Sequence, residues 1–155
     1  MNDGLTVGAA LFLLLCTSMY LGTGWSLVLF SFPTADALRT DNYYSHFVPQ
    51  VEAATRFFTV MTGLMLVAGG VLLVTEWDSP RRWVPVVVLA GVVAATLLTT
   101  RYILPFNREM KAGITDEARL RHTLSRWMRL NRVRVALWTV QWVAMAAWFT
   151  WFAVR

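Results

Sequence analysis

The side chains that could act in acid–base or metal chemistry are few. The chain has two histidines, His46 and His122, and both lie outside the apolar runs, where they could not bind a haem iron between membrane helices. Asp41, Glu52 and Glu109 could add carboxylate ligands for a metal ion. No HxxxH or ExxH spacing brings these groups to one helical face, and arginines close to His122 repel cations. We therefore predict no metal site.

A second group of polar and aromatic residues flanks the apolar runs at what would be one end of a helical bundle. Singly, such residues cap helices or reach toward water at a membrane boundary. Together they predict a pocket with apolar walls and a polar mouth. Its candidate members are Tyr43, His46, Arg56, Arg101, Asn107, Asn131, Arg134 and Trp138.

Composition indicates what holds these residues in place. The 155 residues are 57% hydrophobic and only 15% charged, whereas soluble domains contain about 25% charged residues. So few charges cannot cover a soluble globule of this size, but a lipid bilayer removes that requirement. The length fits a single domain, residues 1–155.

Four apolar runs reach the length of about 20 residues that a membrane-spanning helix needs. A polar segment at about 115–134 has apolar side chains on one stripe and basic ones on the other, so it predicts an amphipathic helix leading into the last run. Leu104-Pro105-Phe106-Asn107 predicts a turn after the third run, and Thr115 is a candidate helix N-cap. The fold class is therefore all-α, an integral membrane four-helix bundle with an amphipathic helical extension before helix four. The predicted spans are about 5–32, 57–75, 84–104 and 135–154.

Basic residues predict the orientation in the membrane. The side with the first and third loops carries eleven Lys and Arg residues and the opposite side carries three. By the positive-inside rule, the loops lie in the cytoplasm and both termini of this multi-pass cell-membrane protein lie outside. Trp77, Trp83, Trp148 and Trp151 fit an aromatic belt on that outer side.

The basic residues also bear on partners. Nine Lys and Arg residues and three acids fall between Arg101 and Arg134. Because apolar runs flank this cluster, it predicts contact with anionic lipid headgroups or an anionic ligand and does not indicate nucleic acid.

Three short motifs are spread along the chain. The first is Tyr20-Leu21-Gly22-Thr23-Gly24-Trp25, in a helix that ends at Phe32-Pro33. The second is Pro105-Phe106-Asn107, and the third is Trp127-x-x-x-Asn131-x-x-Arg134. Together they resemble the anthrone oxygenase-like family of small four-helix membrane proteins, once classified as a domain of unknown function. In the second motif, Phe106 replaces the small or aliphatic residue that the family usually has.

The resemblance implies oxidation of a phenolic, polyketide-type substrate by O2 without a recruited cofactor. Such an oxidoreductase needs a base that removes a benzylic proton and a cation that holds the resulting enolate. His46 is then the candidate base, with Tyr43 as a second choice. Arg134, together with Arg56 or Arg101, would hold the oxyanion. Asn107 and Asn131 would orient the substrate, and Trp138 could form a wall.

Two other functions fit the same residues. The absence of a strong catalytic motif and the small residues on the helix faces also fit a non-enzymatic accessory or scaffold subunit of a membrane complex. The basic amphipathic segment fits a protein that binds a lipid, a quinone or another small apolar ligand. A closed pocket between the helices would favour an enzyme or a binding protein, and a solid bundle would favour a scaffold.

Overall fold

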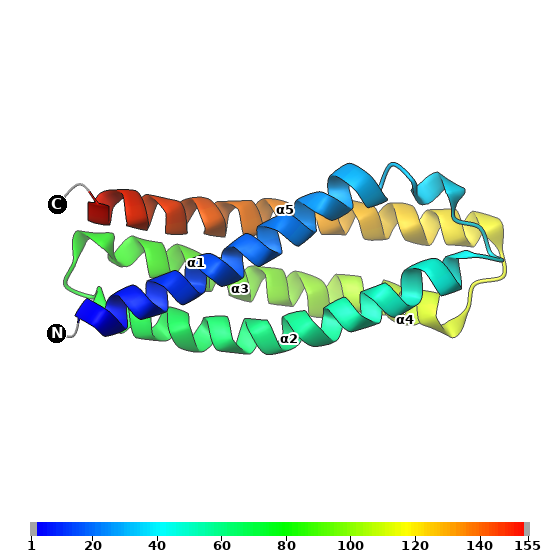
Figure 1. The fold of residues 1–155 in the computed structure, drawn as a ribbon. Helices are drawn as coiled ribbons and strands as arrows, with labels where there is room; N and C mark the ends of the chain where they lie inside the picture. The colour runs from blue at the N-terminus through cyan, green and yellow to red at the C-terminus, as the bar shows by residue number, and fades with distance from the viewer. Residues whose placement is uncertain (1–2, 154–155) are drawn as a thin grey trace.

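All regular structure in the computed structural model, which describes residues 3–153, is helical (Figure 1). The elements are α1 (Asp3–Ser26) with the π-helical segment η1 (Leu27–Ser31), the short 3-10 helix η2 (Ala35–Ala37), α2 (Tyr43–Thr75), the 3-10 helix η3 (Pro80–Arg82), α3 (Trp83–Leu98) with the π-helical segment η4 (Thr99–Ile103), α4 (Leu104–Ala112) and α5 (Glu117–Ala153). α1 and α3 each pack against both α2 and α5. The long helices therefore form a bundle, which α1 crosses diagonally from α2 toward α5 (Figure 1).

Three helical segments in the described range are long and apolar enough to cross a membrane: Gly4–Ser31, Tyr43–Thr75 and Pro80–Ala112. Their outward faces carry exposed large apolar residues, such as Leu15, Phe30, Val67 and Leu97. A helix that is apolar on its outer face as well as toward its neighbours is typical of a lipid environment. These features indicate a membrane protein.

α5 is not among those three segments. Its second half carries four tryptophans and Gln141, which are less apolar than the leucines and valines of the other helices. The predicted final span, 135–154, lies in this half, except that Val154 falls outside the described residues. As the amphipathic pattern predicted, the helix runs without a break from the basic segment into the apolar run.

Two local expectations are wrong. The chain does not turn at Pro105, because α4 continues to Ala112 and ends at Gly113, whose φ is +92°. Pro105 lies in the first turn of α4, where its missing N–H is tolerated, and the π-helical η4 lies directly before α4. Thr115 is not the cap of α5 either, because the Asp116 carboxylate accepts the N–H of Arg119 at 2.6 Å.

The long polar connections at the α4 end of the bundle are tied down by hydrogen bonds. Glu117 accepts the backbone N–H of Thr40 at 2.8 Å and its hydroxyl at 3.0 Å. Because both bonds favour the charged carboxylate, they hold the pKa of Glu117 below its ordinary value. The loop before α2 is thereby joined to the start of α5.

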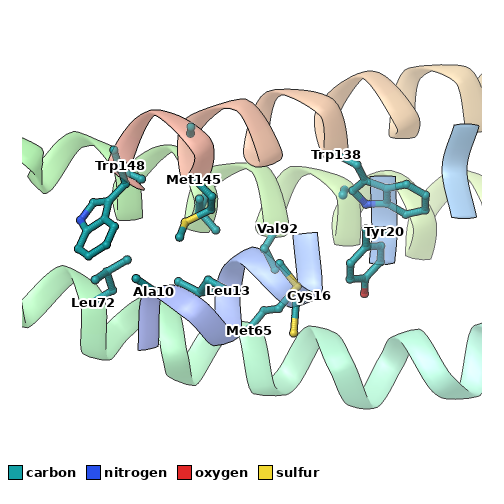
Figure 2. Packing of buried hydrophobic residues seen from close by; sticks show 14 of the residues in the cluster. Ala10, Leu13, Cys16, Tyr20, Met65, Leu72, Val92, Trp138, Met145 and Trp148 are labelled. Carbon is teal, nitrogen blue, oxygen red and sulfur yellow. The ribbon is translucent and has the colours of Figure 1, made fainter. Parts of the chain in front are cut away.

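The opposite end of the bundle contains a buried ion pair. Glu76, which is 2% exposed, pairs with Arg81 at 3.0 Å, and the Arg81 guanidinium lies over the Trp148 ring at 5.1 Å. Trp148 is buried beside Leu72 (Figure 2). It is therefore not part of a lipid-facing belt, whereas Trp77, Trp83 and Trp151 are exposed.

Gly24 sets how closely α1 approaches α5. A Cβ atom at this position would lie 2.8 Å from atoms of both Trp138 and Val135, so only glycine permits the contact. Gly22, one half-turn away on the same helix, has no such neighbour within 4 Å. Gly24 lies in the second half of α1, the half in which the diagonal path of the helix approaches α5 (Figure 1).

We expect Gly24→Ala to destabilise the bundle by about 1–3 kcal/mol, the usual cost of overpacking a tight contact. Gly22→Ala is the matched control, and it should be neutral or stabilise the helix by up to about 1 kcal/mol. Thermal unfolding of both variants in a mild detergent measures the difference. Equal midpoints for the two variants would contradict the close contact.

Candidate functional site

A cavity of about 380 Å³ lies between the helices in the half of the bundle nearer α4. Every long helix contributes to its wall, including Tyr20 of α1, Phe58 of α2, Thr96 of α3, Asn107 of α4 and Arg134 of α5. The bundle is therefore hollow at the end where the sequence predicted a pocket.

Aromatic rings form one wall of the cavity. The Tyr20 ring lies 4.4 Å from that of Phe58 and 4.8 Å from that of Trp138, measured between ring centroids. Figure 2 shows Tyr20 and Trp138 facing each other from α1 and α5. The Tyr20 hydroxyl donates to the carbonyl of Phe58 at 2.9 Å and lies 2.7 Å from the Thr62 hydroxyl. These bonds fix the ring between α1 and α2.

Threonine hydroxyls supply most of the remaining polarity. Thr55, Thr59, Thr62, Thr96 and Thr100 all line the cavity, and each donates to a carbonyl one turn earlier in its own helix. A hydroxyl whose proton is used in this way presents its oxygen as an acceptor. The cavity is thus apolar and aromatic with weakly polar hydroxyl groups.

Arg134 is the one guanidinium among the described residues that line this cavity. It lies over the Trp138 ring at 4.7 Å, donates through Nη2 to the Asn131 side-chain oxygen, and lies 3.4 Å from the Thr99 hydroxyl. No carboxylate forms a salt bridge with it in the described part of the chain. Its Nε is buried and has no hydrogen-bond partner there.

A chain of hydrogen bonds fixes the position of Arg134. The Asn131 side chain is fully buried and donates to the backbone carbonyl of Trp127 at 2.8 Å. The Trp127 indole N–H in turn donates to the Asn107 side-chain oxygen at 2.8 Å. The residues of two motifs far apart in the sequence thus form one network between α4 and α5.

The structure brings together some of the candidate site residues and separates others. Asn107, Asn131, Arg134 and Trp138 form one cluster, and all but Asn131 line the cavity. His46 is exposed and does not line it. Arg101 is exposed and does not line the cavity. Arg56 is also exposed, and it lines a neighbouring surface groove between α2 and α4.

Tyr43 is buried and has a structural position. Its hydroxyl donates to the carbonyl of Met110 at 3.1 Å and accepts the N–H of Ile114 at 2.5 Å. It therefore holds both sides of the sharp connection at Gly113. This placement satisfies the phenol from both directions without any contact to the cavity.

Sequence reasoning gave no role to Tyr20, Phe58 or Gln141 in the cavity wall. Tyr20 carried a signal, because a tyrosine inside an apolar helix needs a partner for its hydroxyl. Gln141 carried a similar signal, as the one strongly polar residue inside the last apolar run. Phe58 carried none, since its direction depends on how the helices rotate against each other. No three of the described His, Cys, Asp and Glu side chains gather closely enough to hold a metal ion.

Comparison with known proteins adds no relative: no family model, curated protein or solved structure matches the chain. The functional argument therefore rests on the site itself.

We expect Tyr43→Phe to lower the free energy of unfolding by about 1–3 kcal/mol, because the buried N–H of Ile114 and carbonyl of Met110 lose their partner. Tyr44→Phe is the matched control, since Tyr44 is exposed and its change should lie within about 0.5 kcal/mol of zero. Chemical denaturation followed by circular dichroism measures both. Equal stability of the two variants would remove the structural role of Tyr43.

Proposed function

We propose that this chain is a multi-pass membrane protein that binds a planar, apolar molecule with a phenolic, enolic or quinone oxygen in the cavity between its helices. The observation that carries the proposal is the Arg134 guanidinium, which lines the cavity and has no carboxylate partner in residues 3–153. An electron-rich oxygen of the ligand would accept a hydrogen bond from the part of the guanidinium that lines the cavity.

Electrostatics supports this choice of ligand. A charge removed from water costs several kcal/mol unless it is paired, and arginine cannot shed its proton to avoid that cost. Asn131 and Thr99 offer neutral oxygens only, so they solvate the guanidinium without neutralising it. A phenolate or enolate at this position would neutralise it and would itself be stabilised.

The size and lining of the cavity support the same ligand class. A volume of about 380 Å³ lies in the range of about 300–1,000 Å³ that small-molecule sites occupy. The rings of Tyr20, Phe58 and Trp138 offer flat faces on which a planar ring system can stack. A flexible, highly polar molecule would gain little from these walls.

We place four helices in the membrane, with the apolar half of α5 as the fourth span. α5 packs along both α1 and α3, so it lies beside two segments that are apolar enough to cross. We keep the orientation that the basic residues predict, in which the α4 end of the bundle lies at the cytoplasmic face of the cell membrane and both termini lie outside. The cavity then opens near the cytoplasmic interface.

A second candidate function is oxidation of the bound molecule by O2, as the resemblance to the anthrone oxygenase-like family implies. Arg134 favours it, because a cation held in an apolar site lowers the free energy of an enolate. The described lining residues include no carboxylate and no histidine, so a base would have to act from outside the wall. His46 remains the candidate for that step, and no cofactor is needed if the enolate reacts with O2 itself.

Binding can be tested with a hydroxyanthrone or hydroxyanthraquinone titrated into the purified protein, using quenching of tryptophan fluorescence. We expect Arg134→Gln to weaken binding roughly 10-fold to 100-fold, because a hydrogen bond to a charged group contributes about 1.5–3 kcal/mol. Arg101→Gln is the matched control and should bind as the natural chain does. Arg134→Lys, which keeps the charge, should retain part of the affinity.

A ligand with the same ring system but no hydroxyl or carbonyl group distinguishes the contribution of the guanidinium to affinity from that of the apolar walls. Its affinity should not change in Arg134→Gln. Unchanged affinity of the hydroxylated ligand in that variant would overturn the proposal.

Oxidation is tested by oxygen consumption with the hydroxyanthrone as substrate. If His46 is the base, His46→Ala should lower the rate about 100-fold or more, in the usual range for general-base catalysis, while ligand affinity stays unchanged. His122→Ala is the matched control, since His122 is also exposed. Equal turnover in the two variants would remove His46 as the base, and no turnover by the natural chain would leave a binding protein.

A further inference from the structure

A second hollow, next to the cavity, lies on the outer surface between α2 and α4. It holds about 420 Å³. Its floor is apolar, with Val51 and Leu104 among its residues, and its rim carries Arg56, Arg108, Lys111 and Glu52. We call it the α2–α4 groove. None of these four charged side chains lines the cavity that we propose as the ligand site.

The rim has an excess of positive charge. Lys111 forms a salt bridge with Glu52 at 2.5 Å, so that lysine is already neutralised. Arg56 and Arg108 are exposed, and neither forms a salt bridge within the described part of the chain. Two guanidinium groups, from different helices, thus remain for an anion in the groove.

The groove lies at the level where the apolar runs end. On α2 the run Phe57–Thr75 begins directly after Arg56, and on the other side of the groove the run Val84–Leu104 ends four residues before Arg108. In a membrane, this level is that of the lipid headgroups. An apolar floor next to two cations at that depth matches a phosphate with acyl chains attached to it.

We infer that the α2–α4 groove binds an anionic glycerophospholipid, whose phosphate lies between Arg56 and Arg108 and whose chains lie along Val51 and Leu104. A zwitterionic lipid fits less well, because its choline or ethanolamine group would bring a further cation to a rim that is already basic. A free phosphate would leave the apolar floor exposed to water. This inference needs the membrane location but does not depend on a ligand at Arg134.

The groove and the cavity are neighbours. Phe47, Val51, Thr55, Leu104 and Asn107 line both. Asn107 also accepts the indole N–H of Trp127, in the network that holds Arg134. A lipid in the groove would therefore pack on the outside of the same side chains that close the cavity.

The test uses native mass spectrometry of the whole chain in a neutral detergent, with dioleoyl phosphatidylglycerol and dioleoyl phosphatidylcholine as probes. We expect phosphatidylglycerol to bind at least 5-fold more tightly than phosphatidylcholine. Each cation near an anionic headgroup contributes about 5-fold in affinity, so Arg56→Gln with Arg108→Gln should weaken phosphatidylglycerol binding by about 25-fold. Binding of phosphatidylcholine should weaken much less, because its choline group already offsets part of the attraction between its phosphate and the two arginines.

The matched control is Arg126→Gln with Arg129→Gln, which removes two exposed arginines from the basic face of α5 outside the groove. An equal loss in this control would show that diffuse charge attracts the lipid and would overturn the site. So would equal affinity for the two lipids, or complete displacement of phosphatidylglycerol by millimolar inorganic phosphate. If the double variant does not fold, Arg108→Gln alone should lose about 5-fold and decides the same question.

Failure of this proposal is separable from failure of the proposed function. The groove variants should bind the hydroxyanthrone with unchanged affinity, because neither Arg56 nor Arg108 lines the cavity. Arg134→Gln should in turn keep its preference for phosphatidylglycerol. If the groove double variant or Arg134→Gln lost affinity for both the hydroxyanthrone and phosphatidylglycerol, the two sites would not be independent and this assignment would be wrong.

Discussion

The rest of this structure depends on how an apolar bundle holds the guanidinium of Arg134. Its neighbours are one aromatic ring, one amide oxygen and one hydroxyl. Each of these neighbours must be positioned by another part of the fold. Asn131 is set by Trp127, Trp127 by Asn107, and Thr99 by the π-helical turn that precedes α4. Irregular helix geometry at η4 is therefore part of how the site is built, as π-helical segments often are.

Close packing at one contact creates the space at another. Gly24 lets α1 lie directly against Trp138 and Val135, so the second half of α1 follows α5 across the bundle (Figure 1). The wall on the α2 side is completed by large rings instead, with Tyr20 reaching from α1 to the Phe58 carbonyl. A small residue on one face and a bulky, hydrogen-bonded one on the other thus leave a defined cavity between helices.

Sequence patterns predicted the helices better than the site. The lengths of the apolar runs and the amphipathic stripe before Val135 depend on local composition, and they indicated the bundle and the unbroken α5. They also placed Asn107, Asn131, Arg134 and Trp138 at one end of it. The turn expected at Pro105 was wrong because a proline is tolerated in a first helical turn, and only the structure shows that η4 precedes it. Which side of a helix faces the cavity depends on rotation and crossing angle, so the roles of Tyr20 and Phe58 and the exposed position of His46 were not accessible from local pattern.

The two partly buried arginines among the described residues show why Arg134 is better explained by a ligand than by stability. Arg81 and Arg134 each lie over a tryptophan of α5, Trp148 and Trp138 respectively. At Arg81 the fold supplies a buried carboxylate, Glu76, and the charge is balanced within the chain. At Arg134 the fold supplies neutral oxygens and a cavity in the place where such a carboxylate could lie. If the only role of Arg134 were to join helices, a paired or apolar residue would do so at lower cost. An arginine held in position but left unbalanced is what a site for an electron-rich oxygen requires.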